Sequence, residues 1–509
     1  MLGIVVNMAG INGFCGEVQD PVLNLLLKKG VVSEEEARNA QIEADALRTN
    51  GVMPSMESKW KLSKAIQNIE IFGDIRLRFE DRQAKTPPGG RLELERGRFA
   101  LRLGLRGEAF DDFYYGVRVD TAQNPRSPWV TFGTSSSGIP YQGPFGKATT
   151  GLDVGQIYLG WHPASGIDLT VGKMPNPLFV TPMTWDPDLN PEGAAERFKF
   201  TVGQAEFFAN FGQFLYQDNN PSYVSSGLVP GILQGQSTDN PFLLAWQGGV
   251  NYHFTTNISA KVGATLFQYI GTKTTNTAAG FGDIFVGEGA YGGPGSGTIE
   301  GSSGFPAGGP YGNFNGFAFN QTGLNSLLVL DFPFEVNFKI RSLSARVFGD
   351  YAVNLEGNDR AQQAYDEAAL LSLGSPFPPS LVHNGPQRNQ NHAYQAGFAL
   401  GNNDSLGLVY GTVSRKRAWE LRAYYQRIEQ YALDPNLMDS DFFEGRGNLE
   451  GIYAAIAYGF TDNVIGTVRY GYASRINNKL GTGGSNQDIP QINPIERYNL
   501  LQLDLTMRF

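Results

Sequence analysis

The chain has 509 residues, of which 41% are hydrophobic, 12% aromatic and only 17% charged, and its formal net charge is −9. The charged fraction lies well below the roughly 25% of soluble globular domains, yet beyond the first residues no apolar run reaches the 18 residues of a membrane helix. A helical membrane protein is therefore excluded, the aromatic content disfavours disorder, and the acidic balance disfavours nucleic acid as a partner. Two classes remain, a large soluble all-β protein and a transmembrane β-barrel.

Residues 1–19 form a short apolar stretch followed by a polar break, which has about the size of a signal-peptide core. No basic residue precedes the stretch and no clear small-x-small cleavage site follows it. We interpret it as the remnant of an export signal. A lipid-modified Cys15 is the alternative interpretation, although Phe14 stands where lipoproteins have a small residue. Since Cys15 is the single cysteine, no intramolecular disulfide can form.

Residues 20–50 predict a helical hairpin. An Asp-Pro start and a closing glycine delimit the first helix, and a capping box of Ser33 and Glu36 begins the second. The second helix presents a narrow face of small apolar residues, which favours a packing or oligomer contact over a chemical site. Residues 51–68 form a polar linker.

From Ile69 onward the hydrophobic period changes from 3.6 to 2. In the first strand the odd positions are apolar (Ile69, Ile71, Ile75, Leu77, Phe79) and the even positions are charged (Glu70, Asp74, Arg76, Arg78, Glu80). The same alternation follows at 98–106 and 113–120. Strands of ten or more residues exceed the usual ~5–6 of globular proteins and match the ~9–11 that cross a bilayer at a tilt.

The alternation continues to the end of the chain. Thirteen further strands bring the predicted total to 16. They lie at 153–162, 167–174, 196–204, 206–216, 242–254, 257–269, 324–333, 335–352, 392–410, 416–431, 449–460, 463–475 and 497–509. Short and long loops alternate between successive strands. The long loops lie near 121–152, 175–195, 217–241, 270–323, 353–391, 432–448 and 476–496. A soluble sandwich has no reason for this pattern, whereas an outer-membrane barrel shows it. We therefore predict an all-β transmembrane protein, a closed antiparallel barrel over 69–509 that follows the helical segment.

The last strand carries a recognisable signature. Leu503, Leu505, Met507 and Phe509 share one face, and the final residue is aromatic. The terminal strand is similar to those of bacterial outer-membrane barrels, and that likeness implies that the barrel-assembly machinery reads it.

Three further segments carry a resemblance beside the terminal strand: LLLKKGVVSEEEA in the helical segment, GKMPNPLF at 172–179 and WDPDLNPEG at 185–193. With them, the whole chain resembles the putative porin family of Gram-negative outer-membrane β-barrel proteins. The resemblance implies a lipid-embedded diffusion channel of the cell outer membrane, monomeric or a homotrimer, with the helical hairpin in the periplasm. The rival hypothesis is a secreted or surface all-β binding or structural protein without channel activity.

Six arginines on three neighbouring strands point to the predicted barrel interior, namely Arg76, Arg78, Arg98, Arg102, Arg106 and Arg118. We interpret them as a basic wall of an aqueous pore, because charges in the lumen set selectivity. In the alternative interpretation a filled interior neutralises them, through Glu70, Asp74, Glu80, Glu108 and Asp120. Since the arginines outnumber the nearby acids that plainly share their face, we expect a positive local potential.

The loop 175–195 carries Asp186, Asp188 and Glu192 among five prolines. It is the third long loop by this count, and the resemblance to 16-stranded porins implies that it folds inward and narrows the channel. An acidic loop opposite the arginines would place a transverse field at the narrowest point. Alternatively, these carboxylates only cap turns.

No enzyme signature emerges from the sequence. The four histidines lack metal-ligand spacing, and there is neither a Gly-x-Ser-x-Gly elbow nor a phosphate-binding P-loop. A Ser/His pair on the barrel wall is the remaining route to an esterase. We expect no catalytic residue, cofactor or metal, and predict passive diffusion of small hydrophilic solutes or ions.

Overall fold

The computed structural model describes residues 28–30, 33, 65–85, 89–122, 127–133, 151–216, 241–270, 326–362, 385–402, 405–482 and 495–509. The chain forms two compact units, Met1–Ala65 and Ile66–Phe509. The predicted export signal (1–19) lies outside the described residues, as do nearly all of the helical hairpin (20–50) and most of the linker (51–68). Among the residues that are described, 357–362 form a short helix, and no helix has the length and hydropathy of a membrane span.

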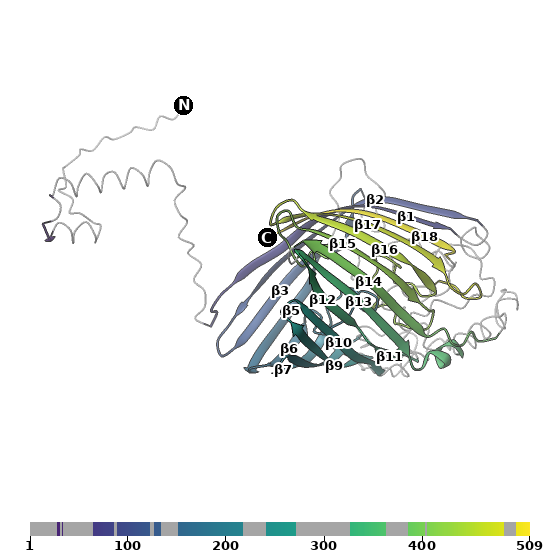
Figure 1. Ribbon diagram of the computed structural model, residues 1–509, viewed down its shortest axis with the longest axis horizontal. Coiled ribbons are helices and arrows are strands. Elements are labelled where there is room, and N and C mark those ends of the chain that lie inside the picture. Colours follow the sequence, from purple (N-terminus) through teal and green to yellow (C-terminus); the bar gives the residue numbers. More distant parts are fainter. Residues whose placement is uncertain are drawn as a thin grey trace, which may run out of the picture. The chain divides into compact units, whose positions relative to one another are not determined.

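The second unit is a wall of long, tilted strands (Figure 1). In chain order they are β1 (Glu70–Lys85), β2 (Arg91–Glu108), β3 (Phe113–Ala122), β4 (Val130–Thr131), β5 (Gly151–Ala164), β6 (Ile167–Lys173), β7 (Glu192–Val202), β8 (Ala205–Leu215), β9 (Phe242–Thr255), β10 (Ile258–Ile270), β11 (Leu328–Asp331), β12 (Phe334–Ile340), β13 (Leu343–Asn354), β14 (His392–Asn402), β15 (Trp419–Ile428), β16 (Leu449–Gly459), β17 (Val464–Arg475) and β18 (Arg497–Arg508).

The eighteen strands form a closed sheet that is sixteen strands around, because two positions in the sheet are each shared by two strands. Both β3 and β4 pair with β2, and both β11 and β12 lie between β10 and β13, so each of these two couples fills one position. The last strand pairs with the first over the register Asp74↔Arg508 to Lys85↔Arg497, and every pairing is antiparallel. The predicted closed antiparallel barrel of about 16 strands is confirmed. Closure leaves no strand edge unpaired in this wall.

The boundary predicted between the strands 324–333 and 335–352 is wrong. The pairing only pauses at Pro333, which has no N–H to donate and whose carbonyl accepts a hydrogen bond from Gly263 N at 3.0 Å. The strand resumes as β12, and the chain turns later, at Arg341, which has a positive φ of 55°.

The predicted strands 392–410 and 416–431 are too long at their junction. The chain leaves the wall after Asn402 and re-enters it at Trp419. Between them the backbone turns inward because the buried Glu420 carboxylate accepts hydrogen bonds from Gly407 N at 2.8 Å and Val409 N at 2.9 Å.

The outer face of the wall is apolar and the inner face is polar, as the alternation predicts. Ile75, Leu77 and Phe79 are 39%, 44% and 42% exposed on the outside. Their neighbours Arg78 and Glu80 are buried on the inside. Moving such an apolar belt from water into hydrocarbon lowers its free energy by roughly 25 cal/mol per Å² of apolar surface, so the belt favours a lipid environment.

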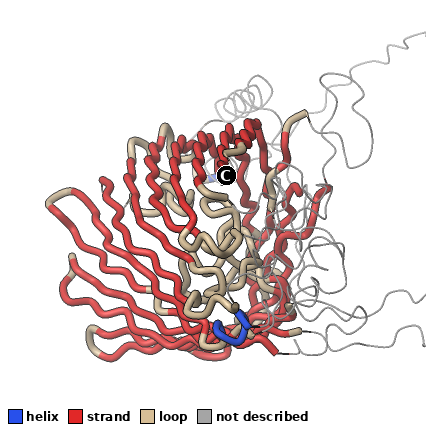
Figure 2. The backbone as a smooth tube through the Cα atoms, turned by 90° about the vertical axis from the view of Figure 1, so that its right-hand side faces the viewer, coloured by secondary structure: helices blue, strands red, loops and turns tan. Residues whose placement is uncertain are grey.

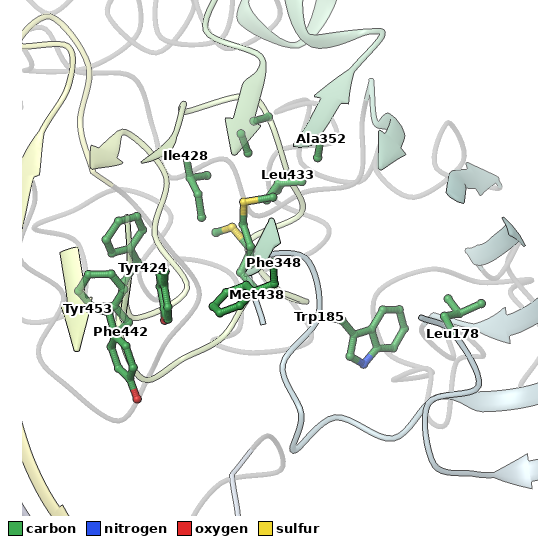
Figure 3. Close-up of a cluster of buried hydrophobic side chains, with 14 of the residues drawn as sticks. Leu178, Trp185, Phe348, Ala352, Tyr424, Ile428, Leu433, Met438, Phe442 and Tyr453 are labelled. Carbon is green, nitrogen blue, oxygen red and sulfur yellow. The ribbon is translucent and has the colours of Figure 1, made fainter. Parts of the chain in front are cut away.

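Three loops fold into the barrel and fill part of it (Figure 2). We call them inner loop A (174–191), inner loop B (405–418) and inner loop C (429–448). Their buried apolar side chains pack with inward residues of the wall, and the cluster includes Leu178, Trp185, Phe348, Tyr424, Met438, Phe442 and Tyr453 (Figure 3). The interior is therefore a packed core on one side and a polar space on the other.

Candidate functional site

A cavity of about 570 Å³ lies between the wall near β1 to β3 and the inner loops. Among the described residues that line it, seven arginines face seven acidic side chains: Arg76, Arg78, Arg102, Arg106, Arg118, Arg469 and Arg508, and Glu70, Asp74, Asp186, Asp188, Asp439, Asp441 and Asp462. Its walls are thus highly charged but balanced.

Most of the residues predicted for the site lie together around this cavity. The two exceptions are Arg98 and Glu192. Arg98 is 2% exposed and donates a hydrogen bond to the Trp129 carbonyl at 3.3 Å. Glu192 begins β7 rather than lying on the loop, and its carboxylate pairs with Lys173 at 2.5 Å.

Arg78 is bonded to two acids from distant parts of the chain. Its side chain is 3% exposed, its guanidinium binds Asp504 of the last strand through two bonds of 2.8 and 2.9 Å, and Asp441 of inner loop C lies at 2.8 Å. The Trp129 ring covers the guanidinium at 4.0 Å. Arg78 therefore joins the first strand, the last strand and an inner loop.

Inner loop A contacts the wall at β2 and at β5. Arg102 Nη2 lies 3.1 Å from Asp188 Oδ1, and Gln156 of β5 donates to Asn190 at 2.9 Å. Asp188 lines both the main cavity and a second one of about 200 Å³. The Arg102–Asp188 pair therefore stands where the two cavities meet.

The remaining arginines of this wall are paired with acids of their own or the next strand. Arg76 lies 2.7 Å from Asp74, and Arg118 lies 2.7 Å from Asp120. Arg106 binds Glu70 at 2.7 Å, and about half of each of these two side chains is exposed. Glu70, Asp74 and Asp120 thus lie beside arginines that the alternative interpretation expected them to neutralise.

Sequence reasoning missed several of the acids that contact the arginines. Asp441 and Glu444 come from inner loop C, more than 350 residues from the arginines they contact, and no local spacing indicates this. Asp504, however, occupies an inward position of the last strand, which closure places beside β1. That acid could have been found from the alternation alone. The described lining holds as many acidic side chains as arginines, and the predicted excess of positive charge stays a prediction.

Inner loop A is held to inner loop C as well as to the wall. Asp186 N donates to the Leu437 carbonyl at 2.6 Å, and the Asp186 carboxylate accepts hydrogen bonds from Ser440 N at 3.1 Å and Oγ at 2.9 Å. It also accepts one from Asp188 N at 2.9 Å, so Asp186 caps a turn, as the alternative interpretation held.

Two aspartates of inner loop C differ in ionisation. Burial favours the neutral acid at Asp441, but Arg78 and Arg82 outweigh it and lower the pKa to about 2. Burial and the carboxylates of Asp441 and Asp186 raise the pKa of Asp439 well above its usual range. Asp439 consequently stays protonated to a higher pH than an ordinary aspartate.

A pair of glycines flanks inner loop A where it leaves β6 and enters β7. Gly172 and Gly193 lie opposite each other and have φ angles of 116° and 148°. A Cβ on Gly193 would lie 2.1 Å from the Gln213 carbonyl oxygen. Only glycine fits here, because both the backbone conformation and the space exclude a side chain.

We expect Gly193→Ala to destabilise the barrel by about 1–3 kcal/mol and to displace inner loop A. The temperature at which the folded band disappears on a detergent gel measures the first effect. Gly248→Ala in β9 is the matched control, since nothing lies within 4 Å of the added Cβ. If the folded band of both variants disappeared at the same temperature, Gly193 would not have the role described here.

Comparisons with known proteins give one family match and several solved structures of low similarity. The family described as putative porin matches residues 65–283 and 316–509. No curated protein matches the chain. Among solved structures, the anion-selective porin from Comamonas acidovorans is 7% identical, with 87% of this chain and 99% of that chain covered and a TM-score of 0.41.

Two further solved structures are similar at the same level. OmpT, an outer membrane protein of Vibrio cholerae, is 9% identical with a TM-score of 0.38, and the match covers 88% of this chain and 99% of that one. A five-residue mutant of the Rh. blastica porin is 9% identical with a TM-score of 0.36, over 87% and 100% of the two chains.

Proposed function

The chain belongs to the putative porin family, and on that premise we propose that it is an outer-membrane channel through which small hydrophilic solutes or ions diffuse passively. The observation that carries the proposal is the charged cavity inside a closed barrel whose outer face is apolar. A water-filled path with ionic walls lowers the cost of moving a polar solute across hydrocarbon.

The path we propose runs beside the inner loops rather than through the barrel axis. The packed core around inner loops A and C occupies the side away from β1 to β3. The arginines of that wall then face Asp186, Asp188 and Asp439 across the cavity. This arrangement supports an arginine-rich wall whose charge is balanced, and we expect weak selectivity between anions and cations.

The placement in the membrane follows from the same proposal. The short turns face the periplasm and the long links face the exterior, as in other outer-membrane barrels. The exposed apolar residues contact outer-membrane lipid, and the terminal Phe509, which is 49% exposed, is offered to the barrel-assembly machinery. We further propose an export signal, a periplasmic helical hairpin and a homotrimer, and no enzymatic activity or cofactor.

Liposome swelling tests the proposal. Vesicles that contain the purified protein should swell in isotonic solutions of small neutral sugars and amino acids, at rates that fall steeply with solute size. Vesicles with heat-denatured protein are the control. A protein that needs no detergent in solution, or that leaves vesicles impermeable after insertion, would favour the rival, an all-β binding protein without a channel.

A further inference from the structure

Three tyrosines and one aspartate gather at one end of the cavity. Tyr410 belongs to inner loop B, Tyr424 to β15, Tyr453 to β16 and Asp439 to inner loop C, and all four line the cavity. We call them the tyrosine–aspartate corner. Their side chains make none of the hydrogen bonds described above that anchor inner loop A, although the Asp439 N–H donates to the Pro182 carbonyl of that loop at 3.1 Å.

The tyrosines offer their hydroxyl groups rather than their ring faces. Tyr424 and Tyr453 are 6% and 5% exposed, and their rings stack at 4.7 Å. Phe348 and Phe442 lie against Tyr424 at 6.2 and 5.9 Å, while Arg422 covers Tyr410 at 4.6 Å. Figure 3 shows the rings of Tyr424, Phe442 and Tyr453 gathered together. Only the polar edges remain available.

These three hydroxyls have no hydrogen-bond partner within the part of the chain that the structure describes, and they are open to the cavity rather than sealed in protein. Leaving a buried hydroxyl without a partner costs about 1–3 kcal/mol. Water or a passing solute must therefore complete their bonding.

Asp439 likewise has no ion-pair partner among the described residues, and its carboxylate accepts the backbone N–H groups of Asp441, at 3.1 Å, and of Phe442. The cations nearby are committed elsewhere. Arg422 binds Glu420 at 3.0 Å, and Arg78 binds Asp441 and Asp504. The corner is thus one carboxylate and three phenolic oxygens, beside arginines whose guanidinium groups are bonded to other acids.

We propose that the tyrosine–aspartate corner binds the primary ammonium group of a solute in transit, an inference that rests on the proposed channel function. An ammonium group has three N–H donors and no acceptor, which matches a carboxylate surrounded by hydroxyl oxygens. It also supplies the positive charge that holds Asp439 ionised. A quaternary ammonium fits poorly, because it has no N–H and the aromatic faces that would bind it are covered.

Single-channel conductance in planar bilayers tests the inference, with ethylammonium chloride and tetramethylammonium chloride as the probes. Both cations carry one charge, but only ethylammonium donates hydrogen bonds. Conductance should saturate as the ethylammonium concentration rises and should stay proportional to the tetramethylammonium concentration. Asp439→Asn and the double variant Tyr424→Phe, Tyr453→Phe should raise the half-saturating ethylammonium concentration about tenfold or more. Tyr470→Phe, on the outer face, is the matched control and should leave it unchanged.

Potassium chloride separates the two proposals. If channels open in potassium chloride but ethylammonium conductance never saturates, or if saturation survives in Asp439→Asn, the corner is no ammonium site while the channel stands. If no channel opens in potassium chloride, the proposed function itself fails. A folded band on a detergent gel for each variant ensures that the loss of saturation is not a loss of the barrel.

Discussion

Replacing Arg102 with alanine should widen the channel and shift its selectivity towards cations. The change removes the ion pair at 3.1 Å that holds inner loop A against β2, together with one positive charge at the predicted narrow point. A unit charge about 4 Å from a passing ion changes its energy by about 1 kcal/mol in water. We therefore expect a roughly fivefold rise in the cation-to-anion permeability ratio and a larger conductance, measured from the reversal potential in a salt gradient.

Arg106→Ala is the matched control for Arg102→Ala. Both residues project inward from β2, but the Arg106 side chain is 52% exposed and pairs with Glu70 away from inner loop A. Salt screens such a charge, so the shift should be much smaller. Asp188→Asn breaks the same pair from the other side and should shift selectivity towards anions. Equal shifts for Arg102→Ala and Arg106→Ala would place the narrow point elsewhere.

Replacing Arg78 with alanine should cause the largest loss of stability. The change removes the cation that the buried Asp504 shares with the half-buried Asp441, and removing one partner of a buried pair costs about 3–5 kcal/mol. Because Arg469 still pairs with Asp504 and Arg82 still lies 3.6 Å from Asp441, we expect a loss near the lower end of that range. The change also removes one of the contacts between inner loop C and the first strand, while the bonds of Arg82 to Asp441 and Glu444 remain. We expect a lower midpoint in urea-induced unfolding in detergent, followed by loss of the folded band.

The controls separate a local charge effect from the closure of the barrel. Arg118→Ala removes an arginine whose partner, Asp120, lies on its own strand, and the midpoint should fall far less. Arg78→Lys keeps the charge but loses the forked bonding to Asp504, so its midpoint should lie between those of the wild type and Arg78→Ala. Similar midpoints for Arg78→Ala and Arg118→Ala would show that Arg78 does not join the strands.

The alternation of apolar and polar residues was sufficient to predict the wall. A period of two fixes which side chains face lipid, and the aromatic Phe509 identifies the last strand, which must then pair with the first. The boundary predicted between 333 and 335 was wrong, because Pro333 only interrupts the pairing and the chain turns later.

The interior could be predicted only in part. The six arginines were correctly placed on the inner face, because that follows from alternation. The inner loops B and C were not foreseen, since their direction depends on single contacts such as the Glu420 carboxylate, which accepts two backbone N–H groups. Several of the acids that face the arginines lie on those loops, so the sequence alone could not indicate how many acids share the cavity with the arginines.

The central claim is that a water-filled path passes between the charged wall and the inner loops. The most direct measurement is the current through single molecules of the unmodified protein in a planar bilayer bathed in potassium chloride. We predict stepwise insertions, each with a current proportional to voltage and with weak selectivity between the two ions. Silence over many insertions of protein that runs as a folded band on a detergent gel would contradict the claim, because the inner loops would then close the barrel completely.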